Sequence, residues 1–153
     1  MPNAEPTHQE KDLLRLSQQL CFALYSTSHA FTRAYKPLLA ELDLTYPQYL
    51  VMLVLWERDD VTVKEIGAQL QLDSGTLTPL LKRLDAAGLV MRSRDAGDER
   101  QVRVSLTESG RALKEKARDI PKHIGAGIGA PLDEIIALRD QLTRIRDHML
   151  TAD

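Results

Sequence analysis

The sequence predicts a mainly α-helical protein that carries one small β-hairpin, and three observations lead to this. Apolar residues recur at helical spacing over most of the chain. Two short helical stretches in the middle are joined by a tight turn, and two alternating segments with a polar turn follow them. The 153 residues, 43% hydrophobic and 27% charged, suit a single globular domain with its own core.

The N-terminal part predicts two helices before the centre of the domain. In residues 11–34 apolar side chains recur at intervals of three, four and seven, as in a helix. A short helix over residues 37–42 is expected next, since the proline at its start interrupts the first. Thr45 then has the chemistry of an N-cap, with Pro47 in the first turn of a helix. The apolar run that ends at Trp56 makes this helix the buried centre.

Two short helices with a tight joint follow. Thr62 and Glu65 form a capping box that opens the first, over residues 63–70. Asp73 is a good N-cap for the second, which ends near Ala86, and a glycine two residues later supplies the stop. This spacing is typical of a helix-turn-helix.

A β-hairpin is predicted after this pair. Residues 89–94 and 101–106 have strand character, and the second alternates valine and leucine with polar side chains. The polar turn between them, residues 95–100, ends in an arginine. Such a hairpin beside a helix-turn-helix forms a wing.

The chain closes with helices that have more apolar surface than a small domain can bury. Thr107 caps a predicted helix that runs to about residue 123, the glycine-rich residues 125–129 break it, and a last helix spans residues 132–150. The wide apolar face of this last helix predicts a homodimer. The expected organisation is a winged helix-turn-helix region at 45–106, with dimerisation helices at 10–42 and 107–150.

The charge distribution favours DNA as a partner. The net charge is −2, but residues 82–103 hold six basic and four acidic side chains, whereas residues 31–81 are net acidic. The alternative is that this basic stretch is only a charged surface hairpin with no nucleic-acid partner. If DNA is the partner, hydroxyl residues at the start of the second helix lie near base edges, and the basic residues of that helix lie near phosphates. The wing arginines lie in the flanking minor groove. These candidates are Ser74, Thr76, Thr78, Lys82, Arg83, Arg94 and Arg100.

Several classes of function are disfavoured. The one cysteine, Cys21, rules out an intramolecular disulfide and cysteine-rich zinc sites, and it fits a reducing compartment. The four histidines lack metal-ligand spacing, so neither a metal nor a cofactor is expected. The longest apolar run is too short for a membrane span, and the acidic N-terminus is unlike a signal peptide, so we expect a cytoplasmic protein.

The order of these elements resembles the MarR family of transcriptional regulators. The specific match is Asp98-Glu-Arg100 followed by Leu106-Thr107, which is similar to that family's wing signature. The resemblance implies that Arg100 enters the minor groove of a pseudo-palindromic operator and that Asp98 braces the wing.

Three further stretches, at 21–25, 35–39 and 46–49, together with residues 72–79, resemble the organic hydroperoxide resistance regulators (OhrR) within that family. The resemblance implies that Cys21 senses peroxide, that Tyr35 and Tyr46 of the partner subunit hydrogen-bond to it, and that Tyr25 lies around this set. Because no second cysteine is present, the chain is similar to the one-cysteine type. A small thiol would then complete the switch as a mixed disulfide, or more peroxide would oxidise the sulfur further.

The distance between Cys21 and Tyr35 along a helix limits how these two residues can meet. Tyr35 follows Cys21 by fourteen residues, roughly 21 Å along one helix, so the two could meet only across two antiparallel subunits. No cationic residue lies one turn from Cys21, which leaves tyrosine hydroxyls to stabilise a thiolate. The alternative for Cys21 is a small buried hydrophobe, and for Tyr49 we expect an ordinary core role.

Two other function classes remain open at this point. One is a MarR-type repressor that a small aromatic acid releases reversibly, and the Cys21 set argues against it. The other is an enzyme such as a thiol peroxidase, which would need a resolving cysteine or a catalytic cluster that the sequence lacks. We therefore expect a non-enzymatic repressor that senses organic hydroperoxide.

Overall fold

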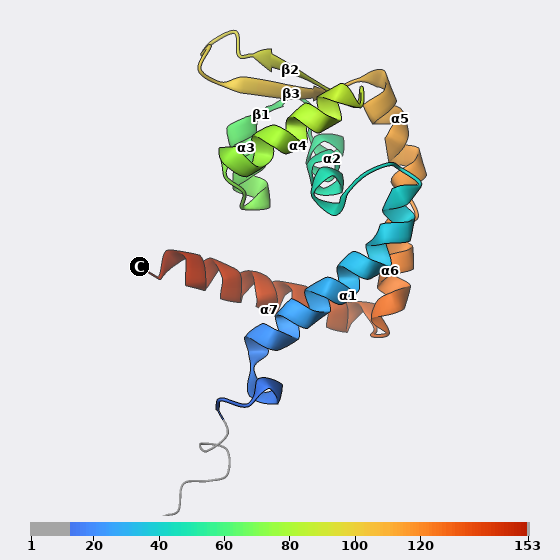
Figure 1. The fold of residues 1–153 in the computed structure, drawn as a ribbon, viewed down its shortest axis with the longest axis vertical. Helices are drawn as coiled ribbons and strands as arrows, with labels where there is room; N and C mark the ends of the chain where they lie inside the picture. The colour runs from blue at the N-terminus through green and yellow to red at the C-terminus, as the bar shows by residue number, and fades with distance from the viewer. Residues whose placement is uncertain (1–12, 153) are drawn as a thin grey trace, which may run out of the picture.

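In the computed structural model, which describes residues 13–152, helices surround one small antiparallel sheet (Figure 1). The sheet and the short helices form a head at one end of the molecule, and longer helices extend away from it. The predicted mainly α-helical fold with a β-hairpin is confirmed. None of the described helices is long and apolar enough to cross a membrane.

The first long helix starts later than predicted. Helix α1 (Leu20–Ala40) follows a short 3-10 helix, η2 (Leu16–Gln18), and the first residues of the predicted helix lie outside the described range. Gln19, between the two, is extended, and its side-chain amide donates to the carbonyls of Leu13 and Arg15. Because these bonds occupy carbonyls that a continuous helix would use, α1 begins only after this residue.

Pro37 does not end α1, and the separate helix predicted for residues 37–42 is wrong. A proline inside a helix removes one N–H donor, here the one that would reach the carbonyl of Arg33. Leu39 is buried in the core two residues later. The packing of this last turn outweighs the missing hydrogen bond, so the helix continues to Ala40.

The predicted N-cap of the central helix is confirmed. Thr45 precedes α2 (Tyr46–Glu57), its hydroxyl oxygen accepts from the amide of Gln48, and the Gln48 side chain accepts from the amide of Thr45 at 2.9 Å. Five side chains of α2 are buried. They are Tyr49, Val51, Met52, Val54 and Leu55.

The helix-turn-helix also begins where the sequence predicts. In α3 (Val63–Leu70) the Thr62 hydroxyl oxygen accepts from the amide of Glu65 at 3.2 Å. In α4 (Ser74–Ala86) a carboxylate oxygen of Asp73 accepts from the amide three residues later at 2.7 Å. Both caps are local, which is why the sequence pattern was sufficient to find them.

The hairpin is confirmed, with strands slightly shorter than predicted. Strands β2 (Val90–Arg94) and β3 (Val102–Leu106) pair antiparallel. A strand that the sequence analysis missed, β1 (Val61–Thr62), pairs with the other edge of β3, so the sheet order is β1-β3-β2. Two residues are too few to show alternation, so only tertiary pairing defines this strand.

The single helix predicted for residues 107–123 is two helices, α5 (Glu108–Ala117) and α6 (Ile120–Ile128). Pro121 has no N–H to donate to the carbonyl four residues earlier, so the first helix ends before it. The first two glycines of the predicted break lie inside α6, and only Gly129, with φ of 72°, ends it. The last helix, α7 (Leu132–Thr151), agrees with the prediction.

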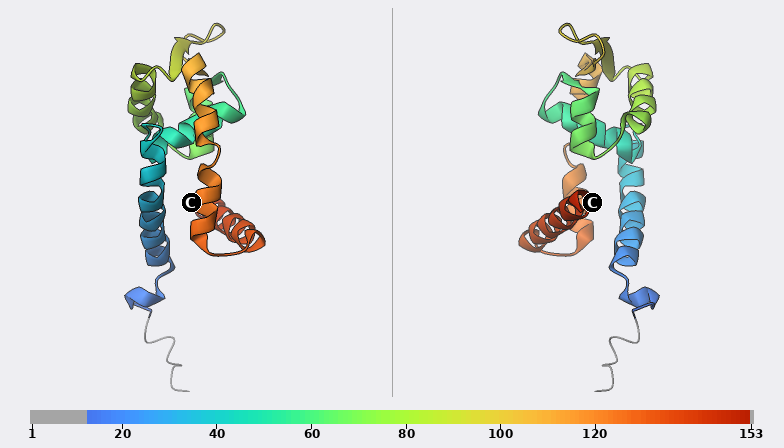
Figure 2. Two further views of the ribbon diagram at one scale, coloured as in Figure 1. Left: turned by 90° about the vertical axis from the view of Figure 1, so that its right-hand side faces the viewer. Right: turned by 90° about the vertical axis from the view of Figure 1, so that its left-hand side faces the viewer.

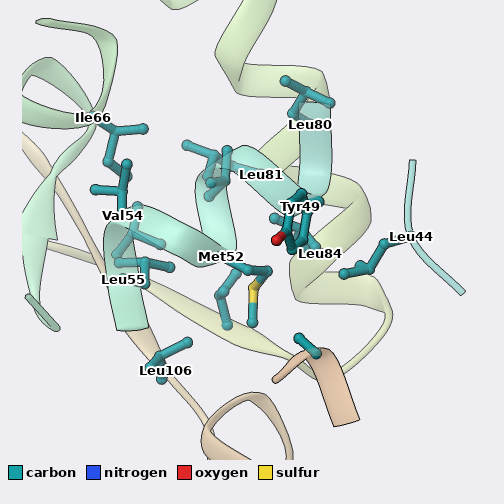
Figure 3. Close-up of a cluster of buried hydrophobic side chains, with 14 of the residues drawn as sticks. Leu44, Tyr49, Met52, Val54, Leu55, Ile66, Leu80, Leu81, Leu84 and Leu106 are labelled. Atoms are coloured by element: carbon teal, nitrogen blue, oxygen red, sulfur yellow. The ribbon is translucent and has the colours of Figure 1, made fainter. Parts of the chain in front are cut away.

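The core lies inside the head, where side chains of α2 meet those of α3, α4 and the sheet (Figure 3). Met52, Leu55, Ile66 and Leu84 are almost fully buried and belong to one hydrophobic cluster. The Trp56 indole N–H donates to the carbonyl of Gly110 at 2.9 Å, which joins α2 to α5.

Outside the head, the helices are largely exposed in a single chain. Figure 2 shows α1 and α6 side by side, with α7 leaving at an angle. Only Leu39 is buried on α1, and no residue of α7 is buried. The exposed large apolar side chains of α1 and α7 are Leu20, Phe22, Leu24, Tyr25, Phe31, Leu132, Ile136, Leu138, Ile145, Met149 and Leu150.

Candidate functional site

Helix α4 presents an exposed arc opposite its buried leucines. The five residues predicted on this helix are exposed, but they divide between two rows. Ser74, Thr78 and Lys82 follow one another at intervals of four, so they share one side. Thr76 and Arg83, seven residues apart, share the other side. The arc therefore combines hydroxyl groups near the start of the helix with a positive charge further along each side.

One hydroxyl on this arc is restricted in what it can recognise. The Thr78 hydroxyl donates to the carbonyl of Ser74 at 2.7 Å. Its hydrogen is therefore used within the helix, and towards a ligand its oxygen can only accept. Such an oxygen suits an amino group on a base edge.

The wing places its arginine in solvent. The Arg100 side chain is 91% exposed, and its Nε donates to a carboxylate oxygen of Asp98 at 3.1 Å. The same oxygen accepts from the backbone amide of Arg100, so Asp98 holds both the backbone and the side chain. Arg94, also exposed, donates from Nη1 to the carbonyl of Glu99 across the turn at 2.9 Å.

A groove of about 730 Å³ lies between the helix-turn-helix and the wing. It brings Ser74, Thr78 and Arg100 together from α4 and the wing turn, whereas the other predicted DNA-binding residues do not line it. Its walls also include Lys64, Gln71 and Arg92, which the sequence analysis did not single out. The sequence feature that could have identified them is a polar or basic side chain near the end of a helix in the helix-turn-helix, or in a strand of the wing.

Three tyrosines from two helices form a cluster (the tyrosine cluster: Tyr35, Tyr46 and Tyr49). The ring centroids of Tyr35 and Tyr46 are 4.9 Å apart, and those of Tyr35 and Tyr49 are 5.8 Å apart. Burial, and then the neighbouring Tyr46 and Tyr49, raise the pKa of Tyr35 to about 12. Burial also raises the pKa of Tyr46 and of Tyr49. All three hydroxyls therefore keep their protons at neutral pH and can donate hydrogen bonds.

The structure brings Tyr35 and Tyr46 together but not Cys21. Cys21 is exposed on the first turn of α1, and Tyr35 lies on the same continuous helix about 21 Å further along. Tyr25 packs its ring on that of His29, with centroids 4.3 Å apart. Tyr49 is 3% exposed, which agrees with the core role expected for it.

A smaller hollow of about 280 Å³ lies beside the tyrosine cluster, between α2 and α5. Tyr49, Leu53 and Trp56 form its apolar side, Lys114 and Arg118 contribute cations, and Glu57 contributes a carboxylate. Among residues 13–152, no group of three or more histidine, cysteine or acidic side chains is arranged to hold a metal ion.

Comparison with known proteins gives consistent matches. The family model for the transcriptional regulators SarA/Rot matches residues 33–117. The HTH-type transcriptional regulator TtmR of Methylorubrum extorquens is 58% identical over 134 residues, which are 88% of this chain and 69% of that protein. The organic hydroperoxide resistance transcriptional regulator of Bacillus subtilis is 58% identical over 110 residues, 72% of this chain and 75% of that protein.

A solved structure is similar over nearly the whole chain. Reduced AbfR bound to DNA has a TM-score of 0.77 and 37% identity, and it covers 92% of this chain and 99% of its own. AbfR is a protein of Staphylococcus epidermidis. Its overoxidised form bound to DNA is also similar, with a TM-score of 0.75 and 36% identity over 92% of this chain and 98% of its own.

Proposed function

Because the chain belongs to the MarR family of winged-helix transcriptional regulators, we propose that it is a homodimeric repressor that releases its operator when organic hydroperoxide oxidises Cys21. Residues 45–106 form the DNA-binding region in this proposal. Residues 10–42 and 107–150 supply the dimerisation helices.

DNA binding is supported by the exposed arc of α4 and by the wing. The row of Ser74 and Thr78 faces the same groove as Arg100, so one nucleic-acid surface can contact the helix and the wing together. The helix enters the major groove, and the wing arginine reaches the adjacent minor groove. The similar AbfR has been solved on DNA. A two-fold dimer then reads a pseudo-palindrome with half-sites about 10 base pairs apart.

The observation that carries the sensor proposal is the incomplete site within one chain. Tyr35 and Tyr46 hold their rings together and keep their hydroxyl protons, but Cys21 lies about 21 Å from Tyr35 along the same helix. The exposed apolar side chains of α1 and α7 provide a surface for a second copy. If the two α1 helices cross antiparallel, Cys21 of one chain meets the tyrosines of the other.

The chemistry is a two-electron oxidation of sulfur. The Cys21 thiolate attacks the terminal oxygen of the hydroperoxide, an S–O bond forms, the O–O bond breaks, and the alkoxide leaves as an alcohol after it takes up a proton. The tyrosine hydroxyls stabilise the thiolate by donating to it. A low-molecular-weight thiol then displaces water from the sulfenic acid to give a mixed disulfide, or a second hydroperoxide gives the sulfinic acid. A bulky or charged adduct does not fit a packed interface, so the DNA-binding helices change their spacing.

The test compares operator binding by the wild type and by Cys21→Ser, with and without cumene hydroperoxide. Both proteins should bind, and only the wild type should release the DNA. Release of the serine variant at the same dose would contradict the sensor role of Cys21.

The cross-subunit site has its own test. A heterodimer of Cys21→Ser with Tyr35→Phe/Tyr46→Phe contains one cysteine, which faces intact tyrosines only if they come from the other chain. Its thiol should oxidise at the wild-type rate, with the homodimer of the double tyrosine variant as the slow control. A heterodimer as slow as that control would exclude the shared site.

A second candidate function is supported by the hollow beside the tyrosine cluster. Its apolar wall matches the ring of a small aromatic acid, and the cations of Lys114 and Arg118 outnumber the one lining carboxylate, that of Glu57. Such a repressor would be released reversibly and in excess reductant, whereas release by Cys21 oxidation would be prevented or reversed there. Operator binding in the presence of benzoate-type acids and dithiothreitol separates the two.

A further inference from the structure

We propose that Arg103 is a positioning residue for DNA binding: through Asp60 and Asp95 it sets where the wing turn stands relative to the helix-turn-helix. The inference rests on the proposed DNA-binding function. Arg103 affects DNA binding through Arg100 and does not itself contact DNA, because its guanidinium is paired with carboxylates.

Arg103 joins two segments that are far apart in the sequence. Its Nε donates to a carboxylate oxygen of Asp60 at 2.9 Å, and its Nη2 donates to the backbone carbonyl of the same residue at 2.7 Å. Its Nη1 donates to Oδ1 of Asp95 at 3.1 Å. Asp60 belongs to the loop before β1, and Asp95 begins the wing turn. One guanidinium therefore links the body of the head to the turn, in the fixed geometry that arginine imposes.

Asp95 passes this link on to the rest of the turn. While Oδ1 faces Arg103, Oδ2 accepts from the amides of Gly97 at 3.0 Å and Asp98 at 2.9 Å. Asp98 in turn holds Arg100. The bond from Arg103 is the first cause, followed by these amides, of the lowered pKa of Asp95. A continuous series of polar contacts thus runs from Asp60 to the arginine of the wing.

Polar contacts matter here because the turn has no apolar anchor. No residue from 95 to 101 is buried, and the turn side chains are acidic, basic or small. Without side chains packed in the core, the direction of the turn depends on hydrogen bonds and ion pairs. The paired Arg103 has an exposed side-chain fraction of 31%, against 91% for Arg100, which fits an internal role for the first and an external one for the second.

The decisive variant is Asp95→Asn. Asparagine keeps one acceptor oxygen for the turn amides but turns an NH₂ group towards Arg103, so it breaks the link selectively. Simple electrostatics predicts tighter DNA binding when an acidic charge is lost beside a wing. The positioning role predicts the opposite, a loss of about three- to tenfold in operator affinity, because Arg100 is no longer held in place.

Glu99→Gln is the matched control. It removes the same charge from the same turn, and within the described part of the chain no side chain pairs with the Glu99 carboxylate. Operator affinity of this variant should be unchanged or higher. If Asp95→Asn also raised affinity, the role of Arg103 would be overturned.

Combination with Arg100→Ala distinguishes positioning from general damage to the fold. In that background Asp95→Asn should cause no further loss of affinity, since the arginine that it positions is absent. An equal loss in both backgrounds would show that the link does not act through Arg100.

A measurement on the free protein, without DNA, tests the Arg103 link independently of the proposed DNA-binding function. Hydrogen exchange of the free protein should quicken across residues 95–101 in Asp95→Asn and in Arg103→Lys, but not in Glu99→Gln. Unchanged exchange would refute the link even if the protein binds its operator. Faster exchange in a chain that binds no operator would instead count against the proposed function alone.

Discussion

The contact between α5 and the sheet predicts a large loss of stability for Gly110→Ala. A Cβ atom at Gly110 would lie 2.1 Å from the carbonyl oxygen of Leu89 and 3.2 Å from a methyl carbon of Leu106. The first atom is backbone and cannot rotate away, so α5 must move by about 1.3 Å, from 2.1 Å to 3.4 Å, to reach an ordinary contact.

This displacement of α5 lowers the free energy of unfolding through two effects. Overpacking of this kind destabilises by about 1–3 kcal/mol. It also strains the hydrogen bond from Trp56 to the carbonyl of Gly110 and the bond from the Thr107 amide to Leu89, each worth about 1 kcal/mol. We therefore expect a loss of about 3–5 kcal/mol, a large part of the stability of an ordinary domain.

Urea unfolding measures this loss, with circular dichroism as the signal and one protein concentration throughout, because dimers unfold in a concentration-dependent way. Gly75→Ala is the control, since its Cβ meets nothing closer than a flexible carboxylate oxygen at 3.4 Å. It should remain within about 1 kcal/mol of the wild type. A Gly110→Ala protein as stable as this control would refute the packing argument.

The remaining predictions concern DNA binding, the dimer and the tyrosine cluster. Arg100→Ala should weaken operator binding by about 1–3 kcal/mol and reduce the salt dependence by roughly one phosphate contact; unchanged values in a salt titration would exclude a wing contact. If Cys21 meets Tyr35 of an antiparallel partner, the two α1 helices cross at Ser28, which lies midway between these residues. Ser28→Cys in the Cys21→Ser background should therefore give a disulfide-linked dimer on non-reducing gels. A persistent monomer would argue against this crossing. Burial raises the pKa of Tyr35 from about 10 to about 12, so the unfolded chain loses this proton first and stability should fall as pH rises through that window. Tyr35→Phe should lack this contribution in alkaline unfolding curves, and an identical pH dependence in both proteins would contradict it.

The sequence alone determined the elements that local chemistry controls. Thr62 and Asp73 cap their helices through residues only three positions away, and the apolar periodicity of α7 lies within one helix. The alternation in β3 predicted the hairpin for the same reason. These interactions connect near neighbours, so their residue types are sufficient to predict them.

Local signals failed where a longer-range contact competed with them. Pro37 is a helix breaker by its chemistry, but the burial of Leu39 keeps it within α1. Strand β1 exists only because β3 pairs with it. Pro121 did carry a readable local signal, and the break before α6 could have been predicted from it.

The candidate sites divide in the same way. The wing signature and the residue types of the tyrosine set were visible in the sequence. Only the tertiary structure decided that Tyr35 and Tyr46 lie ring against ring, that Cys21 stands apart from them in one chain, and that Arg103 joins Asp60 to Asp95. Each of these arrangements joins residues of separate helices or loops. Burial of side chains from α1, α2, α3 and α4 supplies the free energy that packs the helices, whereas the wing turn, which has no buried side chain, is held by hydrogen bonds and ion pairs.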